Sequence, residues 1–83
     1  MGDLYCEIVT PIKVIYNAPV GLVTVPGDKG AFTLLKNHAP IVSVLSKGKI
    51  RVIGKDGHEN FFNCERGVLE CENNKVTILI QKG

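Results

Sequence analysis

The sequence predicts an all-β fold in which two antiparallel sheets pack face to face as a sandwich. Turn-forming residues interrupt the chain about every seven to twelve residues, which leaves no room for long helices. The segments between these breaks are short and rich in β-branched and aromatic residues, and several alternate in period two. About nine such segments in 83 residues indicate a sandwich or a barrel, of which we favour the sandwich, with residues 1–83 as a single domain.

The first half of the chain contains three clear strand-like segments. Residues 4–9 alternate, with apolar side chains at the even positions. Asn17-Ala18-Pro19 is one of the runs of turn-forming residues that predict a break between strands. Residues 31–35 have the character of a strand, and residues 41–45 carry apolar side chains on both faces, as expected for a strand that is buried twice or faces a partner.

The best local hairpin signal is Asp56-Gly57, which joins residues 50–53 to residues 60–63. Asp-Gly supplies the positive φ values that a tight hairpin turn needs. Within residues 60–63, the adjacent Phe61 and Phe62 must point to opposite faces, so they cannot form one base-stacking platform.

A second hairpin is predicted at Asn73-Asn74, between residues 68–71 and residues 76–79, since asparagine tolerates the left-handed region. Glu70 and Glu72 share one parity of the strand before this turn. We expect both carboxylates to face solvent rather than to act as a catalytic pair.

Composition places the chain among ordinary globular proteins, with 45% hydrophobic and 22% charged residues. The net charge is +2 and the basic residues are scattered, so the sequence carries no strong nucleic-acid or acidic-lipid footprint. No run approaches the roughly 18 apolar residues of a membrane span, and Met1-Gly2-Asp3 does not open a secretory signal. These features predict a cytosolic protein.

The three cysteines and two histidines do not form a recognisable metal or nucleophile motif. Zinc ligands usually come in pairs two to four residues apart, whereas Cys6 stands alone and six residues separate Cys64 from Cys71. We expect three reduced, buried thiols, with no metal bound by them or by His38 and His58.

The glycine-bounded loop Pro26–Gly30 raises the question of a phosphate site. A P-loop continues with Ser or Thr at the start of a helix, and here the lysine is followed by Gly30 and a strand-like segment. No catalytic signature is present elsewhere, so we expect no ATP binding, no cofactor and no enzyme activity. The residues alone leave a small all-β module that binds a protein or a carbohydrate.

Five segments in order resemble the epsilon subunit of F-type ATP synthase, in its N-terminal β-sandwich domain. They are residues 7–11 (EIVTP), 26–32 (PGDKGAF), 38–42 (HAPIV), 47–52 (KGKIRV) and 67–71 (GVLEC). The resemblance covers nearly the whole chain but not the family's C-terminal helical hairpin, so the hairpin's braking of ATP hydrolysis and its ATP binding are not carried over.

The resemblance implies a ten-stranded sandwich that acts as a rotor subunit of the central stalk and helps couple c-ring rotation to the gamma subunit, and so proton transport to ATP synthesis. It implies peripheral attachment at the cytoplasmic face of a bacterial inner membrane, only through these partners. By resemblance, the c-ring contact comprises Gly27, Asp28, Lys29, Gly30, Ala31, Phe32 and His38, with His38 close to the same end as the loop. By resemblance, Thr10 and Ser43 face the gamma subunit. Two departures from the family pattern lie at Lys36-Asn37, in place of Pro-Gly, and at Ala31, in place of an acidic residue.

Overall fold

The computed structural model describes residues 2–81, and every regular element in that range is a strand. Period-two alternation of apolar side chains is what drives these segments into strands, as the buried and exposed positions of β7 and β8 alternate residue by residue. The strands are β1 (Leu4–Val9), β2 (Val14–Val25), β3 (Phe32–Leu34), β4 (Ile41–Leu45), β5 (Gly48–Gly54), β6 (Glu59–Cys64), β7 (Arg66–Glu72) and β8 (Lys75–Gln81).

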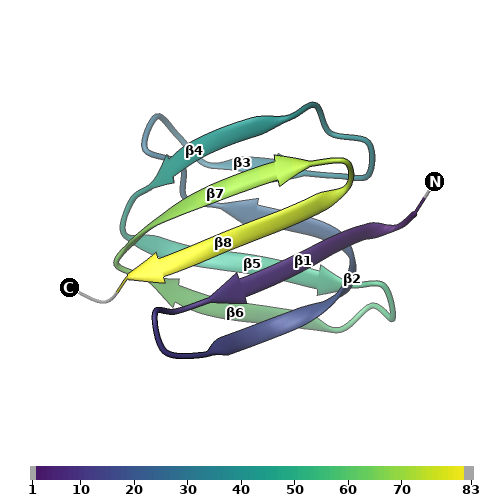
Figure 1. Ribbon diagram of the computed structural model, residues 1–83, viewed down its shortest axis with the longest axis horizontal. Coiled ribbons are helices and arrows are strands. Elements are labelled where there is room, and N and C mark those ends of the chain that lie inside the picture. Colours follow the sequence, from purple (N-terminus) through teal and green to yellow (C-terminus); the bar gives the residue numbers. More distant parts are fainter. Residues whose placement is uncertain (1, 82–83) are drawn as a thin grey trace.

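The strands form two layers with the core between them (Figure 1). One layer has the order β4-β7-β8-β1 and ends on the first half of β2. The second half of β2 lies in the other layer, between β3 and β5, and β6 completes that layer. We call these the β4–β1 layer and the β5–β6 layer.

The strand count and the pairing differ from the sequence prediction. The described residues form eight strands instead of ten, joined by hydrogen bonds into one sheet that passes from layer to layer through β2. The pairing is also not wholly antiparallel, because β1 and β8 run parallel. These two strands are the first and the last of the chain, so no tight hairpin connects them and nothing local fixes their direction.

The break expected at Asn17-Ala18-Pro19 is absent, because β2 continues through it. The carbonyl of Pro19 accepts a hydrogen bond from the amide of Lys55, on the side of β2 away from β1. In a strand, the N–H and the C=O of one residue point to the same neighbouring strand. The nitrogen of Pro19 therefore also points away from β1, and its missing N–H removes no hydrogen bond to β1. The strand instead turns one residue further on, at an irregularity between Val20 and Leu22.

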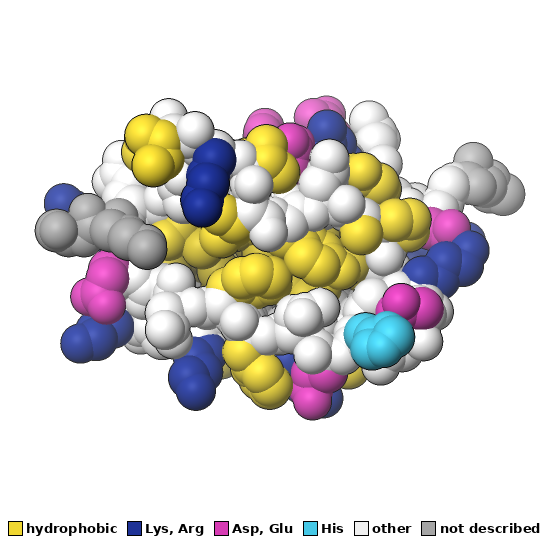
Figure 2. All heavy atoms as spheres, turned by 90° about the horizontal axis from the view of Figure 1, so that it is seen from below, with side chains coloured by type: hydrophobic (Ala, Val, Ile, Leu, Met, Phe, Trp, Pro, Cys, Tyr) yellow, Lys and Arg dark blue, Asp and Glu magenta, His cyan; other side chains and the backbone are white. Residues whose placement is uncertain are grey.

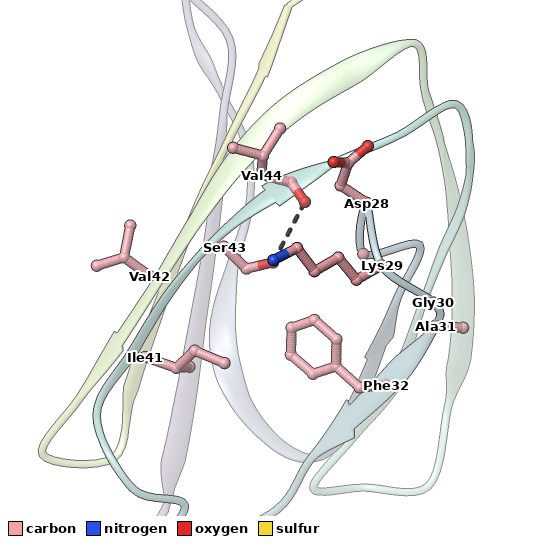
Figure 3. Close-up of a pocket in the computed structure, with 10 residues that line it drawn as sticks. Asp28, Lys29, Gly30, Ala31, Phe32, Ile41, Val42, Ser43 and Val44 are labelled. Atoms are coloured by element: carbon pink, nitrogen blue, oxygen red, sulfur yellow. Dashed lines mark hydrogen bonds between the residues drawn. The ribbon is translucent and has the colours of Figure 1, made fainter.

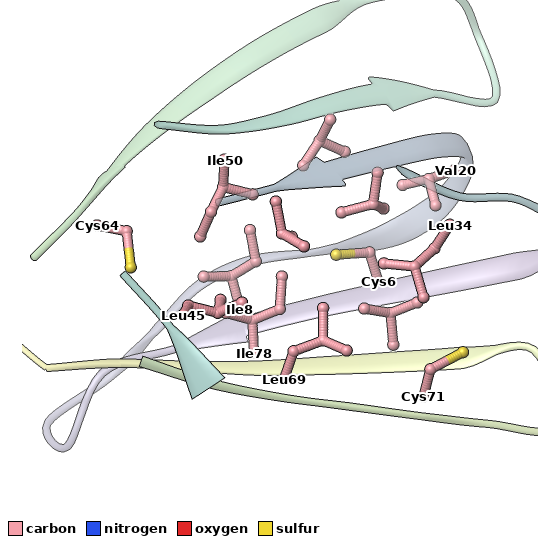
Figure 4. Packing of buried hydrophobic residues seen from close by; sticks show 14 of the residues in the cluster. Cys6, Ile8, Val20, Leu34, Leu45, Ile50, Cys64, Leu69, Cys71 and Ile78 are labelled. Atoms are coloured by element: carbon pink, nitrogen blue, oxygen red, sulfur yellow. The ribbon is translucent and has the colours of Figure 1, made fainter. Parts of the chain in front are cut away.

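The core contains apolar side chains from both layers (Figure 4). The expected alternation is confirmed in β1 and β8, whose inward residues are almost completely buried. The buried side chains are Leu4, Cys6, Ile8, Val20, Val23, Val25, Leu34, Leu45, Ile50, Val52, Cys64, Leu69, Cys71, Val76, Ile78 and Ile80. Tyr16 and Phe62 close the space between the layers edge to face, with ring centroids 5.5 Å apart.

Both predicted hairpins are confirmed. Gly57 has φ 90° in the loop between β5 and β6, and its amide donates to the carbonyl of Gly54 at 2.9 Å. Asn73 and Asn74 have φ 52° and 62° between β7 and β8. Both asparagines of the second turn therefore adopt the left-handed region, whereas in the first turn only Gly57, and not Asp56, has a positive φ.

The β5–β6 turn carries an exposed ion pair that should make His58 titrate above its ordinary value. The Asp56 carboxylate lies 2.9 Å from His58 Nδ1, and this hydrogen bond raises the pKa of His58 above 6.5. Hydrogen bonds from the backbone and ring of His58 lower the pKa of Asp56 below 3.8. The pair therefore stabilises the folded chain fully between pH 3.8 and pH 6.5, the ordinary pKa values of the two groups. This stabilisation falls as pH rises through the folded pKa of His58.

NMR titration of the His58 ring checks this expectation, with Asp56→Asn as the comparison. The midpoint should fall toward the ordinary histidine value in that variant. An unchanged midpoint would show that Asp56 does not hold the proton on His58.

Candidate functional site

Residues 27–31, which form the loop between β2 and β3, are fastened to the end of β4. The amide of Asp28 donates to the carbonyl of Val44 at 2.9 Å, and the amide of Ser46 donates to the carbonyl of Pro26 at 2.8 Å. The Ser46 hydroxyl also donates to the Asp28 carboxylate at 3.0 Å. The first part of the loop is therefore held against the end of β4, while Asp28 and Lys29 remain exposed.

The two glycines of this loop are needed for different reasons. A Cβ on Gly27 would lie 2.7 Å from the carbonyl oxygen of Gly30 and 2.8 Å from the Phe32 ring, so any side chain would collide. Gly30 has space around it but adopts φ 125°, a conformation that L-residues rarely take. The spacing Gly-x-x-Gly is thus explained by a tight turn that packs under Phe32.

A groove of about 530 Å³ separates this loop from β4 (Figure 3). The Phe32 ring and the Ile41 side chain line its lower part, and Ser43 lies between the strand and Lys29. Ser43 is half-buried, has the same parity as the buried Leu45, and donates its hydroxyl to the neighbouring carbonyl of Val44 at 3.2 Å. Its side chain therefore faces the loop and not the outer surface of the β4–β1 layer.

His38 does not lie with the loop, contrary to the expectation that both occupy one end. The turn that contains it follows β3 and contacts the β7–β8 turn, where the amide of Asn37 donates to the Asn74 side chain at 2.6 Å. Loop 27–31 contacts the other end of β4, at Val44 and Leu45. The two segments lie at opposite ends of the molecule because β3 and β4 run between them (Figure 1).

Thr10 and Ser43 are also separate. Thr10 begins the β1–β2 turn, where its hydroxyl oxygen accepts a hydrogen bond from the amide of Lys13 at 3.2 Å. It lines a groove at the open side of the sandwich, between this turn and the Phe61 and Phe62 positions of β6. Figure 2 shows apolar side chains gathered along the middle of that side.

Sequence reasoning missed a regular row of apolar side chains on the surface. Five apolar side chains lie in one row across the outer face of the β4–β1 layer, one from each strand. Cross-strand pairing aligns Val44 with Val68, Val68 with Leu79, Leu79 with Val9, and Val9 with Val14. At about 4.8 Å between strands, this outer stripe is about 19 Å long.

The outer stripe is accessible along most of its length. Val14, Val44 and Val68 are 52%, 59% and 46% exposed, and Val9 and Leu79 are half-buried. The sequence held a partial signal, since residues 41–45 are apolar on both faces and Val68 shares the outward parity of Glu70. The alignment across five strands depends on which strands pair and in which register, and the sequence pattern does not show either.

The three cysteine thiols are shielded from solvent. Cys6, Cys64 and Cys71 are buried and unpaired, and burial raises the pKa of each, that of Cys6 to about 12. Such thiols remain protonated and do not act as nucleophiles. Residues 2–81 contain no cluster of three or more His, Cys, Asp or Glu side chains placed to hold a metal ion. They also contain no helix that is long and apolar enough to cross a membrane.

Comparison with known proteins assigns the sequence and the fold to the same group. Residues 3–82 match the family described as ATP synthase, Delta/Epsilon chain, beta-sandwich domain. The chain is 37% identical over 75 residues to the ATP synthase epsilon chain of Chlorobium limicola, covering 90% of this chain and 85% of that protein. It is 39% identical over 80 residues to the epsilon chain of Campylobacter jejuni, covering 95% of this chain and 62% of that one.

Solved structures share the fold at lower sequence identity. A chain in the cryo-EM structure of the Euglena gracilis mitochondrial ATP synthase (OSCP/F1/c-ring) superposes with a TM-score of 0.89 at 18% identity, over 96% of this chain. A chain of the Tetrahymena thermophila central stalk/c-ring structure gives 0.80 at 14% identity, over 98% of this chain. This chain spans 51% and 65% of those two chains.

Proposed function

Because the chain belongs to the ATP synthase delta/epsilon β-sandwich family, we propose that it is a non-catalytic rotor subunit of the central stalk. In this role it contacts the gamma subunit and the c-ring and helps transmit rotation between them. Proton transport through the ring is thereby coupled to ATP synthesis. The whole chain, residues 1–83, acts as one sandwich domain attached to the cytoplasmic face of a bacterial membrane through its partners.

The observation that carries the gamma contact is the outer stripe. An apolar row about 19 Å long on a regular strand face offers a flat, rigid docking surface. Within it, Val44, Val68 and Val14 are exposed although they are β-branched and apolar, which a partner that covers them would explain. We place the gamma subunit on this face, bordered by Thr10 at one end of β1.

The c-ring contact is proposed at Gly27–Phe32. The loop is exposed, yet hydrogen bonds to β4 hold its backbone, so it can transmit force without local rearrangement. Ala31 gives this chain no carboxylate at that position, but Asp28 and Lys29 present charges beside it. His38 belongs to this contact only if the ring reaches the opposite end of β3 and β4, so the loop is the central element of the proposal.

The same hydrogen bonds argue against a nucleotide site in the loop. A phosphate cradle needs free backbone amides, and here the amide of Asp28 donates to Val44 while that of Gly30 donates to Gly27. Lys29 is followed by Gly30 and the strand β3, without the helix that carries the hydroxyl of a P-loop. The proposed role therefore requires protein contacts alone.

Co-purification tests the proposed function. Tagged chain should capture the gamma subunit and the c-ring from detergent-solubilised membranes of a bacterium that encodes it. A variant with Lys55→Gln should capture both partners as well as the unchanged chain does, because Lys55 lies in the β5–β6 turn, at the end of the molecule opposite loop 27–31. Failure to capture either partner, with the chain folded and both partners intact, would instead favour a generic protein- or carbohydrate-binding module.

A further inference from the structure

The charges of the described residues are divided unevenly between the two ends of the sandwich. One end is formed by turn 10–13, loop 27–31, the β4–β5 turn and the β6–β7 turn, which lie together at the left of Figure 1. We call it the basic end. Its four cations are Lys13, Lys29, Lys47 and Arg66, all exposed, and its two carboxylates are Asp28 and Glu65.

The cations of the basic end are free of ion pairs within the part of the chain that the structure describes. At the opposite end, the Lys55 ammonium lies 2.6 Å from the Asp3 carboxylate, and the Lys75 ammonium lies 3.7 Å from that of Glu7. The two carboxylates of the basic end form no ion pair among residues 2–81 either, and Asp28 accepts its hydrogen bond from Ser46. The basic end thus presents several unneutralised positive charges in one direction.

An unusually exposed apolar side chain projects from the same end. Ile12 is 88% exposed, more than any other large hydrophobic residue of the described chain, and it lies between Pro11 and Lys13. Its turn is held by Thr10, whose hydroxyl oxygen accepts from the amides of Ile12 and Lys13 at 3.3 and 3.2 Å. These hydrogen bonds hold the backbone of the turn, and so they fix the position from which the Ile12 side chain projects.

We propose that the basic end binds directly to the surface of a bilayer that contains anionic phospholipids, with Ile12 inserted among the headgroups. Cations near such a surface are attracted by about 1 kcal/mol each, and an apolar side chain adds burial at the interface. The contact extends the membrane attachment beyond partner proteins alone. It has the same orientation as the proposed ring contact, because loop 27–31 belongs to the basic end.

The combination of Ile12 with Lys13 distinguishes a bilayer from a nucleic acid. A nucleic acid or an acidic protein could neutralise the cations, but a nucleic acid offers no hydrocarbon to an isoleucine that projects into solvent beside a lysine. The exposed side chains of the four loops include no aromatic ring for base stacking. Dependence of binding on Ile12 is therefore the critical measurement.

Flotation of the full 83-residue chain with vesicles tests the proposal. The chain should float with vesicles of phosphatidylcholine and phosphatidylglycerol at roughly 7:3, a ratio that approximates the anionic lipid content of a bacterial membrane. It should not float with vesicles of phosphatidylcholine alone. Lys29→Gln with Lys47→Gln should lower the partition coefficient about 25-fold, at about fivefold for each cation. Lys36→Gln with Lys55→Gln removes the same charge from the opposite end and should change it less than about twofold.

Ile12→Ser should lower the partition coefficient further, whereas Val42→Ser, at a 71% exposed position of β4, should leave it unchanged. Circular dichroism establishes that each variant is folded. Equal losses for the two lysine pairs, or binding that ignores Ile12→Ser, would overturn the proposal in favour of non-specific attraction to any polyanion.

The outcome is independent of the proposed function. The vesicles contain no gamma subunit and no c-ring, so a failure to float leaves the co-purification result untouched. Conversely, flotation without capture of either protein would support the lipid contact and remove the rotor role.

Discussion

Replacing Ile78 by alanine should lower the free energy of unfolding by about 2–5 kcal/mol. Ile78 is completely buried in β8, and pairing places it beside Ile8 of β1 and Leu69 of β7. Alanine would leave a cavity among strands that the surrounding chain cannot close, because β8 is hydrogen-bonded on both edges. For a chain of this length the total stability is only about 4–12 kcal/mol, so the loss is a large part of it.

Urea denaturation monitored by circular dichroism measures this effect. Val42→Ala deletes the same kind of side chain at a 71% exposed position and should change stability by less than about 0.5 kcal/mol. Similar losses for the two variants would show that side-chain burial in this core does not account for the stability of the sandwich.

Replacing Val68 by aspartate should weaken capture of the gamma subunit about 30-fold or more, equivalent to about 2 kcal/mol or above. Val68 lies at the second position of the outer stripe, with Val44 on one side and Leu79 on the other. A carboxylate there would interrupt the apolar row and, once covered by a partner, would be buried without an ion pair. The fold should tolerate it, because the side chain is 46% exposed in the free chain.

Phe61→Asp is the matched control for this experiment. Phe61 is 55% exposed on the outer face of the β5–β6 layer, where the Lys49 ammonium lies 5.9 Å from its ring centroid. Capture should survive Phe61→Asp and fail with Val68→Asp. The reverse pattern would move the gamma contact to the β5–β6 layer. If capture survives both substitutions, neither outer face is the centre of the gamma contact.

The orientation of individual side chains followed from sequence wherever one parity of a strand was clearly apolar. Even-numbered residues of β1 and β8 are buried, Glu70 and Glu72 are exposed, and Phe61 and Phe62 point to opposite faces, all as the alternation predicts. In β4 the sequence Ile-Val-Ser-Val-Leu is apolar at both parities, so the pattern could not say where Ser43 points. Loop 27–31 decides this, because it lies on the side that Ser43 faces, whereas the exposed side chains of Val42 and Val44 point away from it (Figure 3).

By itself the sequence determined the all-β class, the two asparagine- and glycine-dependent hairpins, the family, and the inward side of those strands that have one clearly apolar parity. These depend on period-two burial and on backbone conformations allowed to single residues, and both are local. The tertiary structure alone decided the parallel pairing of β1 with β8, the passage of β2 through Pro19 into the second layer, and the separation of His38 from loop 27–31. It also aligned the outer stripe and collected the basic end, since contacts between residues distant in the chain depend on strand order and register, which no local pattern encodes.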